Sequence, residues 1–425
     1  MNKKMNGWEK DKLDNLCKKI QSGGTPKSDR VEYYGGDIPF VTIEDITASK
    51  KYLQKTKRTI TVLGLNDCAA WVVPKNSVMY SIYATIGEPL INEIEAATNQ
   101  AILNIITDNQ KINSEFLYYF LLNIKSEVYK YSAQTTQSNL NAAIVKSFEI
   151  AYPSLPEQTR IAQILSQADE AIAHTEALIA KYQRIKTGLM QDLLTRGIDE
   201  QGQIRSEATH PFKDSPLGRI PEEWEVVMLG FMVEAIDPQP DHRTPPSVEM
   251  GVPYLGINDI DELGNIDYRK CRKVSLSVLE EHKARYQLRR GDIIFGKIGT
   301  VGSPKRLIKT DNITLSANLI LIQPKNSNDF VYWLLNSDFV ERQVKDSIHS
   351  TSQPAYGIEK IRKIVVPLPK QNEQELIATR LNCTNSSIQQ QQSHLAKLQS
   401  IKRGLMQDLL SGRVRVHTPQ THTTA

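Results

Sequence analysis

Cysteine is scarce in this chain of 425 residues, and the few that occur are scattered. Its four cysteines are Cys17, Cys68, Cys271 and Cys383, and no two of them form a Cys-x-x-Cys pair. Zinc sites and disulfide frameworks need regularly spaced cysteines, so the sequence favours neither. A chain without disulfides suits a reducing compartment, and we expect it in the cytoplasm.

Long apolar runs are also missing. No stretch reaches the roughly 18 apolar residues of a membrane span, and the first residues lack the apolar core of a secretion signal. Hydrophobic residues make up 40% and charged residues 24%, as in ordinary folded proteins. The net charge of +4 permits a nucleic-acid partner without arguing for one.

Catalytic motifs are absent as well. The sequence has no His-Glu-x-x-His, Gly-x-Ser-x-Gly or Gly-x-Gly-x-x-Gly. Residues 291–297 begin like a phosphate loop, but Ile298 stands where Ser or Thr would bind magnesium. Asp241 and Lys283 lie too far apart to read as a nuclease motif. The sequence therefore favours binding over catalysis, with a nuclease or methyltransferase carrying fused recognition domains as the alternative.

What the chain does contain is an internal repeat. The segment Gly188–Leu194, GLMQDLL, recurs as Gly404–Leu410, an offset of 216 residues (404 minus 188). Further matched landmarks keep the same order: Trp8-Glu9 with Trp224-Glu225, Thr25-Pro26 with Thr244-Pro245, Ile38–Phe40 with Val252–Tyr254, and Phe116–Leu122 with Phe330–Leu335. Self-similarity at one period is the signature of duplication.

Each half begins with mixed α and β patterns. Short runs rich in Val, Ile and Tyr, such as Ser77–Tyr83 and Asp292–Phe295, alternate with turn residues. One or two helices are expected to follow in each half, around 114–130 and 328–345. We therefore predict an α/β domain at the start of each half.

Each half ends in a heptad pattern. No proline occurs between Glu157 and Arg196, and apolar residues recur at gaps of three and four, which is typical of a coiled-coil seam. The seam residues are Ile161, Leu165, Ile172, Ile179, Leu189 and Leu193, and in the second half Ile377, Leu381, Ile388, Leu395, Leu405 and Leu409. Lys186 and Lys402 interrupt the seam at matching positions.

A helix of about 40 residues would be roughly 60 Å long. One such helix cannot bury its stripe alone, whereas two helices related by the repeat can pair antiparallel. The alternative is that each stripe packs only on its own domain.

We predict an α+β fold with two similar α/β domains in tandem. Two long helices, forming an antiparallel coiled coil with pseudo-twofold symmetry, separate them. The predicted parts are a first domain at 1–155, a first helix at 156–198, an exposed linker at 199–220, a second domain at 221–369, a second helix at 370–412 and a flexible tail at 413–425.

Candidate DNA contacts fall into three groups. A charge run is often only a solvated face and a polar loop only a flexible turn, but both recur in the two halves. The motif Ile-x-Asp-Ile occurs at 43–46 and again at 257–260, and a basic run suited to phosphate follows each copy: Lys50, Lys51, Lys55, Lys57 and Arg58, then Arg269, Lys270, Arg272 and Lys273. Polar loops suited to base edges are Gln134, Thr135, Thr136, Gln137 and Asn139, then Ser350, Thr351, Ser352 and Gln353. Strand ends and turns add Thr25, Lys27, Tyr80, Tyr83, Thr85, Arg243, Lys297 and Thr300.

Three motifs together carry a family resemblance. They are Pro-x-x-Trp-Glu at 221–225, Leu-Pro-x-Gln at 155–158 and 368–371, and Lys-x-Gly-Leu-Met-Gln-Asp-Leu-Leu at 186–194 and 402–410. With the tandem domains and long helices, residues 5–412 resemble the specificity subunit of type I restriction–modification enzymes.

The resemblance implies two target recognition domains, each reading one half of an asymmetric split DNA site. The paired helices would separate the domains and dock methyltransferase subunits, two copies being expected from the repeat, and restriction subunits would join the complex. S-adenosylmethionine, ATP and magnesium would belong to those partners, and this chain would hold no cofactor or metal. Two domains on a rigid spacer suit DNA contacts about 34 Å apart. The remaining alternative is a coiled-coil scaffold that binds only protein. The basic runs that recur in both halves argue against it.

Overall fold

The computed structural model describes residues 7–134, 140–241, 243–326, 328–349 and 356–417. The chain divides into two compact units. Unit 1 consists of Met1–Glu176 with Ser393–Ala425, and unit 2 of Ala177–Gln392. Each unit therefore contains one sheet-bearing domain and a portion of both long helices.

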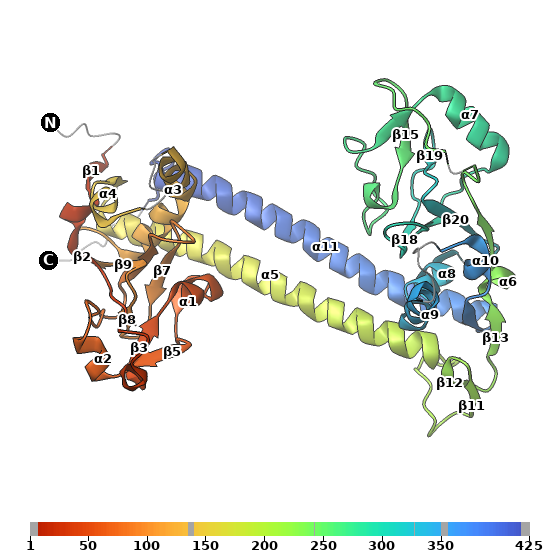
Figure 1. Ribbon diagram of the computed structural model, residues 1–425, viewed down its shortest axis with the longest axis horizontal. Coiled ribbons are helices and arrows are strands. Elements are labelled where there is room, and N and C mark those ends of the chain that lie inside the picture. The colour runs from red at the N-terminus through yellow and green to blue at the C-terminus, as the bar shows by residue number, and fades with distance from the viewer. Residues whose placement is uncertain (1–6, 135–139, 242, 327, 350–355, 418–425) are drawn as a thin grey trace. The chain divides into compact units, whose positions relative to one another are not determined.

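A five-stranded sheet in the order β2-β9-β6-β7-β4 lies at the centre of unit 1 (Figure 1). A three-stranded sheet, β5-β3-β8, and the pair β1-β10 complete its strands. The elements are β1 (Glu9–Lys12), η1 (Leu13–Leu16), β2 (Cys17–Ser22), η2 (Val31–Tyr33), β3 (Tyr34–Val41), α1 (Ile43–Ala48), β4 (Tyr52–Leu53), β5 (Arg58–Ile60), α2 (Val62–Asn66), β6 (Val78–Ser81), β7 (Pro89–Asn92), β8 (Ala97–Thr98), β9 (Ile102–Thr107), α3 (Ser114–Gln134), α4 (Ala142–Lys146) and β10 (Glu149–Tyr152). The inner strands β6 and β9 are nearly all buried, which explains their continuous apolar runs.

Unit 2 repeats this plan. Its larger sheet has the order β14-β20-β17-β18, its smaller sheet the order β16-β15-β19, and β13 pairs with β21. The elements are β11 (Phe212–Ser215), β12 (Gly218–Pro221), β13 (Glu225–Met228), α6 (Leu229–Met232), β14 (Val233–Ile236), β15 (Val252–Leu255), η3 (Ile257–Asp259), β16 (Arg272–Val274), α7 (Leu276–Arg285), β17 (Ile293–Gly296), β18 (Gly302–Arg306), β19 (Thr314–Leu315), β20 (Leu319–Pro324), α8 (Asn328–Leu335), α9 (Asp338–His349), α10 (Ile358–Arg362) and β21 (Val365–Leu368). The predicted duplication of an α/β domain is confirmed.

The predicted domain helices occur, with one difference. Unit 1 has the single helix α3, whereas unit 2 has α8 and α9 with Asn336 and Ser337 between them. The Asn336 amide donates to the carbonyl oxygen of Tyr332 at 2.8 Å, and the Ser337 hydroxyl donates to that of Leu334 at 2.6 Å. Such local side-chain bonds compete with helix hydrogen bonds and end α8 there.

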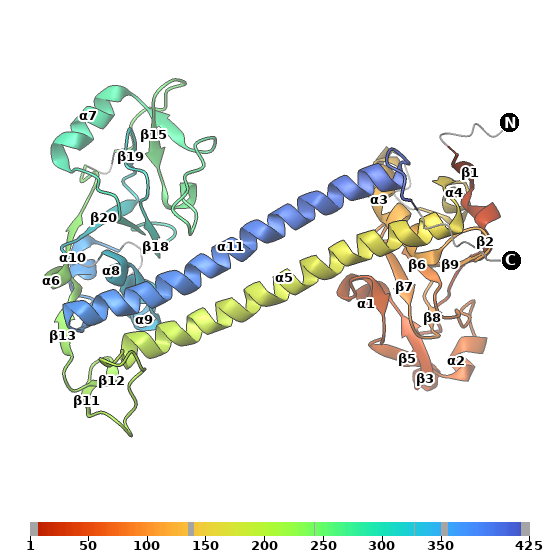
Figure 2. The same ribbon diagram turned by 180° about the vertical axis from the view of Figure 1, so that it is seen from behind.

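The two long helices are α5 (Leu155–Thr195) and α11 (Gln371–Leu410). In unit 1, Ile161 and Leu165 near the start of α5 share a core with Leu409 near the end of α11. In unit 2, Ile377 and Leu381 near the start of α11 share a core with Leu193 near the end of α5. The start of one helix thus lies beside the end of the other within each unit, as both views show (Figure 1 and Figure 2). The predicted antiparallel pairing is confirmed, and every seam residue is buried or half-buried.

The linker and the described part of the tail are mostly exposed or half-buried, yet an arginine anchors each of them to a long helix. In unit 2, β11 and β12 form a hairpin, and Arg205 is buried against the carboxylate of Glu373. In unit 1, the Arg415 guanidinium pairs with Glu157 at 2.7 Å, so the described part of the tail is anchored. The sequence suggested neither contact because each joins residues far apart in the chain.

Candidate nucleic-acid interface

Loops meet at one end of the larger sheet in unit 1. The turn between β6 and β7 holds Tyr83, which is 38% exposed, and Thr85, whose carbonyl oxygen accepts a hydrogen bond from the Ser81 hydroxyl. This turn is joined to the β8–β9 loop, because the Ile82 amide donates to the carbonyl oxygen of Ala101 at 2.9 Å. The exposed Thr25, in the loop after β2, bonds to Gln100 in that same β8–β9 loop.

The matching loops meet in unit 2. The Lys297 amide, at the turn between β17 and β18, donates to the carbonyl oxygen of Asn318 at 2.7 Å. The Tyr356 amide donates to the carbonyl oxygen of Lys297 at 2.9 Å. The exposed Thr300 lies in this turn. The Gln239 side chain donates to the carbonyl oxygen of the exposed Arg243 and accepts from the Tyr254 hydroxyl, which accepts from the Ala317 amide in the loop between β19 and β20. Each domain therefore gathers exposed polar side chains from three separate loops, a geometry suited to reading base edges in a groove.

Two predicted arginines occupy the same place in the smaller sheets. Arg58 on β5 lies opposite Phe40 on β3, and Arg272 on β16 lies opposite Tyr254 on β15. Both side chains are exposed. A matched arginine on each small sheet is a natural phosphate contact, with Lys55 and Lys273 as exposed neighbours.

Three predicted contacts are corrected by burial. Lys51 is 8% exposed and its ammonium group bonds to Ser166 at 2.6 Å. Lys297 is 7% exposed and pairs with Asp237 at 2.5 Å. Tyr80 is fully buried, and burial raises the pKa of its phenol. Their polar groups face the interior, so we remove all three from the candidate interface.

Several predicted lysines are exposed but already paired with acids. Lys50 pairs with Glu176 at 2.9 Å and Lys57 with Glu44 at 2.5 Å. Both Arg269 and Lys270 pair with Asp267, and these side chains lower the pKa of its carboxyl. Exposed pairs are weak enough to be exchanged for phosphate contacts. Lys27 is exposed in the loop after β2.

The predicted polar loops lie largely outside the described residues. Residues 135–139 and 350–355 are not described, and of Gln134 only the backbone is. The first described residue after the second of these segments, Tyr356, bonds to the β17–β18 turn. Their role stays a prediction.

Sequence reasoning missed Gln100 and Asn318. Both are exposed in the loop that precedes an inner strand of the larger sheet, β9 or β20. An exposed amide side chain within two residues of a buried apolar run, in both halves, was the signal that could have found them. Their side chains suit adenine edges.

The start of each long helix is fixed by a buried glutamine. The Gln158 side chain accepts from the Asn113 amide at 2.8 Å and donates to the carbonyl oxygens of Lys111 and Pro153. The Gln374 side chain donates to the carbonyl oxygen of Pro369 at 2.9 Å. Gln374, and not the exposed glutamine of the second Leu-Pro-x-Gln, is therefore the counterpart of Gln158. This explains why the Glu-Gln pair recurs in the repeat.

Within the described ranges, no group of three or more His, Cys, Asp or Glu side chains is placed to hold a metal ion. The described helices include none with the length and apolar character needed to cross a membrane.

Comparison with known proteins gives two family matches. The type I restriction modification DNA specificity domain matches residues 5–184 and 221–399. The specificity subunit of the MjaIX type I restriction enzyme of Methanocaldococcus jannaschii is 26% identical over 418 residues, covering 96% of this chain and 94% of that protein. The EcoBI specificity subunit of Escherichia coli is 21% identical over 426 residues, covering 96% of this chain and 86% of that protein.

Solved structures agree on the fold. The crystal structure of a type I restriction–modification S subunit from M. genitalium superposes with a TM-score of 0.59 at 17% identity, covering 95% of this chain and 96% of that chain. A chain from a structural study of type I complex assembly and conformational transition superposes with a TM-score of 0.56 at 17% identity, covering 97% and 100%. With two family domains matched over most of its length, the chain belongs to the DNA specificity subunits of type I restriction–modification systems, a non-catalytic family.

Proposed function

We propose that the two domains, at 1–155 and 221–369, each read one half of an asymmetric bipartite DNA site. The observation that carries this is the same set of loops and the same small-sheet arginine in two domains that differ in sequence. Equivalent folds with different loop residues suit two different half-sites, so the full site is not a palindrome.

We further propose that the chain brings methyltransferase and restriction subunits to that site. Each unit presents the start of one long helix beside the end of the other, so a partner that recognises this arrangement has two places to bind. Two methyltransferase copies are therefore expected. These partners would carry S-adenosylmethionine, ATP and magnesium.

The contacts we propose are the exposed members of the three groups. Phosphate would be met by Lys55, Arg58, Arg272 and Lys273, and base edges by the loops that contain Thr25, Tyr83, Arg243 and Thr300. The exposed Gln100 and Asn318 join them, whereas the hydroxyl of Thr85 is buried and is left out. Phosphate contacts fix register and base contacts supply sequence preference.

The experiment is co-expression of the full chain with its methyltransferase subunit, followed by mapping of methylated adenines across a genome. The proposal predicts one split motif with two unlike halves and a gap of fixed length. A continuous or palindromic motif, or no methylation by a folded complex, would contradict it.

A further inference from the structure

Unit 1 contains a buried polar contact between its domain and both long helices. Lys51 reaches from the domain and donates to the Ser166 hydroxyl on α5 at 2.6 Å. The Lys51 ammonium also lies 3.3 Å from Glu115 and 3.3 Å from the Tyr119 hydroxyl, both on α3. It sits 4.7 Å from the centre of the Tyr119 ring, and desolvation lowers the pKa of this lysine.

The contact continues to the second helix. The Tyr119 hydroxyl donates to Asp169 on α5 at 2.7 Å. Lys402 on α11 pairs with the same Asp169 at 2.5 Å and lies 6.0 Å from the Tyr119 ring. One connected set of bonds therefore ties the domain, α5 and α11 together inside unit 1. We call this set, Lys51, Glu115, Tyr119, Ser166, Asp169 and Lys402, the unit 1 junction.

Unit 2 contains the same junction built from other residue types. Arg306 pairs with Asp329 at 3.1 Å and lies 4.2 Å from the Tyr332 ring. Asn382 on α11 donates to Asp329 at 2.6 Å and accepts from the Trp333 indole at 3.0 Å.

The cross-helix lysine is also matched. Lys186 on α5 donates to Asn385 on α11 at 2.8 Å and lies 5.0 Å from the Trp333 ring. The unit 2 junction is thus Arg306, Asp329, Trp333, Asn382, Asn385 and Lys186.

The two junctions correspond residue by residue except at the cation. Asp329 follows Glu115 by 214 residues (329 minus 115), and Asn382 follows Ser166 by 216 (382 minus 166). Lys51, however, precedes β4, whereas Arg306 ends β18. Lys51 and Arg306 are therefore not equivalent positions of the repeat, although each supplies the positive charge of its junction. The two domains therefore place a cation at the same point of the junction from different elements, Lys51 being buried and the Arg306 side chain 25% exposed.

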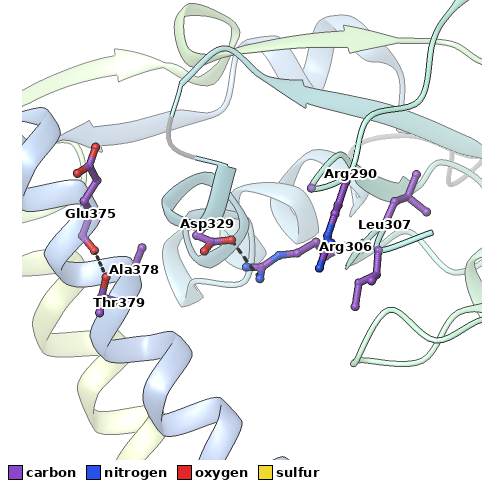
Figure 3. A pocket seen from close by; sticks show the side chains of 9 residues that line it. Arg290, Arg306, Leu307, Asp329, Glu375, Ala378 and Thr379 are labelled. Carbon is purple, nitrogen blue, oxygen red and sulfur yellow. Dashed lines mark hydrogen bonds and ion pairs between the residues drawn. The ribbon is translucent and has the colours of Figure 1, made fainter. Parts of the chain in front are cut away.

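Packing beside each junction is incomplete. In unit 2 an open cavity of about 770 Å³ lies between the domain and the start of α11, lined by Arg290, Arg306, Asp329 and Thr379 (Figure 3). In unit 1 a cavity of about 500 Å³ occupies the matching place, lined by Asn76, Glu115, Thr159 and Gln163 among others. Apolar contact is non-directional, whereas hydrogen bonds are directional. Where packing is interrupted, the junction fixes the orientation of the domain on its helices.

We propose that these junctions determine which gap between half-sites the chain accepts. Lys51 and Arg306 are positioning residues: they hold each reading domain in one orientation and do not touch DNA. This rests on the proposed bipartite reading, because a fixed gap requires each reader to be held rigidly. The hydrogen bonds of a polar network restrict the orientation of the groups they join more narrowly than apolar packing does.

The test compares two neighbouring lysines. Lys51→Met and Lys55→Met each remove one positive charge from the same basic run, but only Lys51 belongs to the junction. Each full chain is co-expressed with the methyltransferase subunit on plasmids that carry both half-sites with the gap varied one base pair at a time. The readout is the ratio of methylation at the wild-type gap to methylation at gaps one base pair longer or shorter.

For Lys51→Met we expect the same half-site sequences but a gap ratio that falls about tenfold, as loss of one charged hydrogen-bond network implies. For Lys55→Met we expect weaker methylation at every gap length and an unchanged ratio. Tyr119→Phe removes only a hydroxyl from the same junction. It is the variant to measure if Lys51→Met gives too little folded chain. Asn382→Ala tests the unit 2 junction in the same way.

An unchanged gap ratio in folded Lys51→Met or Tyr119→Phe complexes would overturn the inference. So would a fall in the ratio for Lys55→Met as large as that for Lys51→Met. Failure of the proposed function is seen separately, because the wild-type chain would then give no split motif at all.

Discussion

At the scale of single residues, Glu157 and Glu373 show how the repeat reuses a position. Glu373 accepts from the Trp224 indole at 3.0 Å and pairs with Arg205 in the linker. Glu157 is held by Arg415 in the tail. The tail therefore supplies the arginine that pairs with this glutamate in unit 1, and the linker supplies it in unit 2.

Replacing Arg415 should destabilise the chain in a pH-dependent way. Arg415 lowers the pKa of Glu157 below its ordinary value of 4.5. The pair therefore stabilises the folded state fully above pH 4.5, and the contribution is lost as the pH falls through the lowered pKa. We expect Arg415→Ala to lower the melting temperature at pH 7 by about 2–4 °C. The difference should vanish in acid below the lowered pKa. Arg413→Ala, an exposed neighbour, is the control, and an equal loss at both pH values would contradict the prediction.

The two cross-helix lysines, Lys402 and Lys186, have different partners. Exchanging Asp and Asn at those partners should therefore change the free energy of unfolding in opposite directions. Lys402 pairs with the carboxylate of Asp169, whereas Lys186 donates to the neutral amide oxygen of Asn385, and burial lowers the pKa of Lys186. Giving a buried ammonium a carboxylate offsets part of its desolvation. We expect Asn385→Asp to raise the free energy of unfolding by about 1 kcal/mol at pH 7 and Asp169→Asn to lower it by a similar amount. Denaturant unfolding measures both, and changes of the same sign would refute the assignment.

Arg58 is predicted to act on DNA as a simple phosphate contact. For the assembled complex with DNA, Arg58→Ala should weaken binding to all sequences alike and reduce the salt slope of log K by about 1. Lys51→Met should leave that slope unchanged, because its charge is buried. Equal slopes for the wild-type and Arg58→Ala chains would remove Arg58 from the interface.

Lys51 is buried and Arg58 is exposed, and the sequence did not predict this difference. Both belong to one basic run, and nothing in the run separates the buried lysine from the exposed arginine. The difference arises from Glu115 and Ser166, which come from helices distant in sequence. The two arginines on the small sheets were accessible to prediction because the repeat matched them.

At the scale of elements, the heptad pattern predicted the long helices to within a few residues of their observed ends. A local period of this kind needs no knowledge of the rest of the fold. The hairpin β11–β12, the break between α8 and α9 and the short strand β4 were not predicted. Strand pairing depends on distant partners, and the helix break depends on which side chains find a backbone acceptor.

Charged residues placed in the apolar seam of the two long helices should separate them. Leu189 and Leu405 are half-buried in the cores of their units. Leu189→Asp combined with Leu405→Asp should cost several kcal/mol and abolish assembly with the methyltransferase subunit. Co-purification measures this, with the exposed pair Lys181→Asp and Lys397→Asp as the matched control. Normal assembly of the leucine double variant would refute the seam.

At the scale of the whole molecule, the duplication explains why the sequence predicted the family and its function better than it predicted the residues that contact DNA. The order of landmarks and the shared helix-end motif identified the architecture and the family. Base-contacting residues lie in loops whose sequences differ between the halves, so the repeat gives no pattern for them. The junctions were hidden for a different reason, since their cations come from unmatched positions.

The most direct test of independent readers is a domain exchange. Residues 1–150 would be replaced by the matching segment of a relative with a different target, and methylated adenines mapped with the same methyltransferase subunit. We expect one half of the split motif to change to that of the relative while the other half and the gap remain. A motif that changes in both halves, or in neither, would contradict the claim that each domain reads its own half-site.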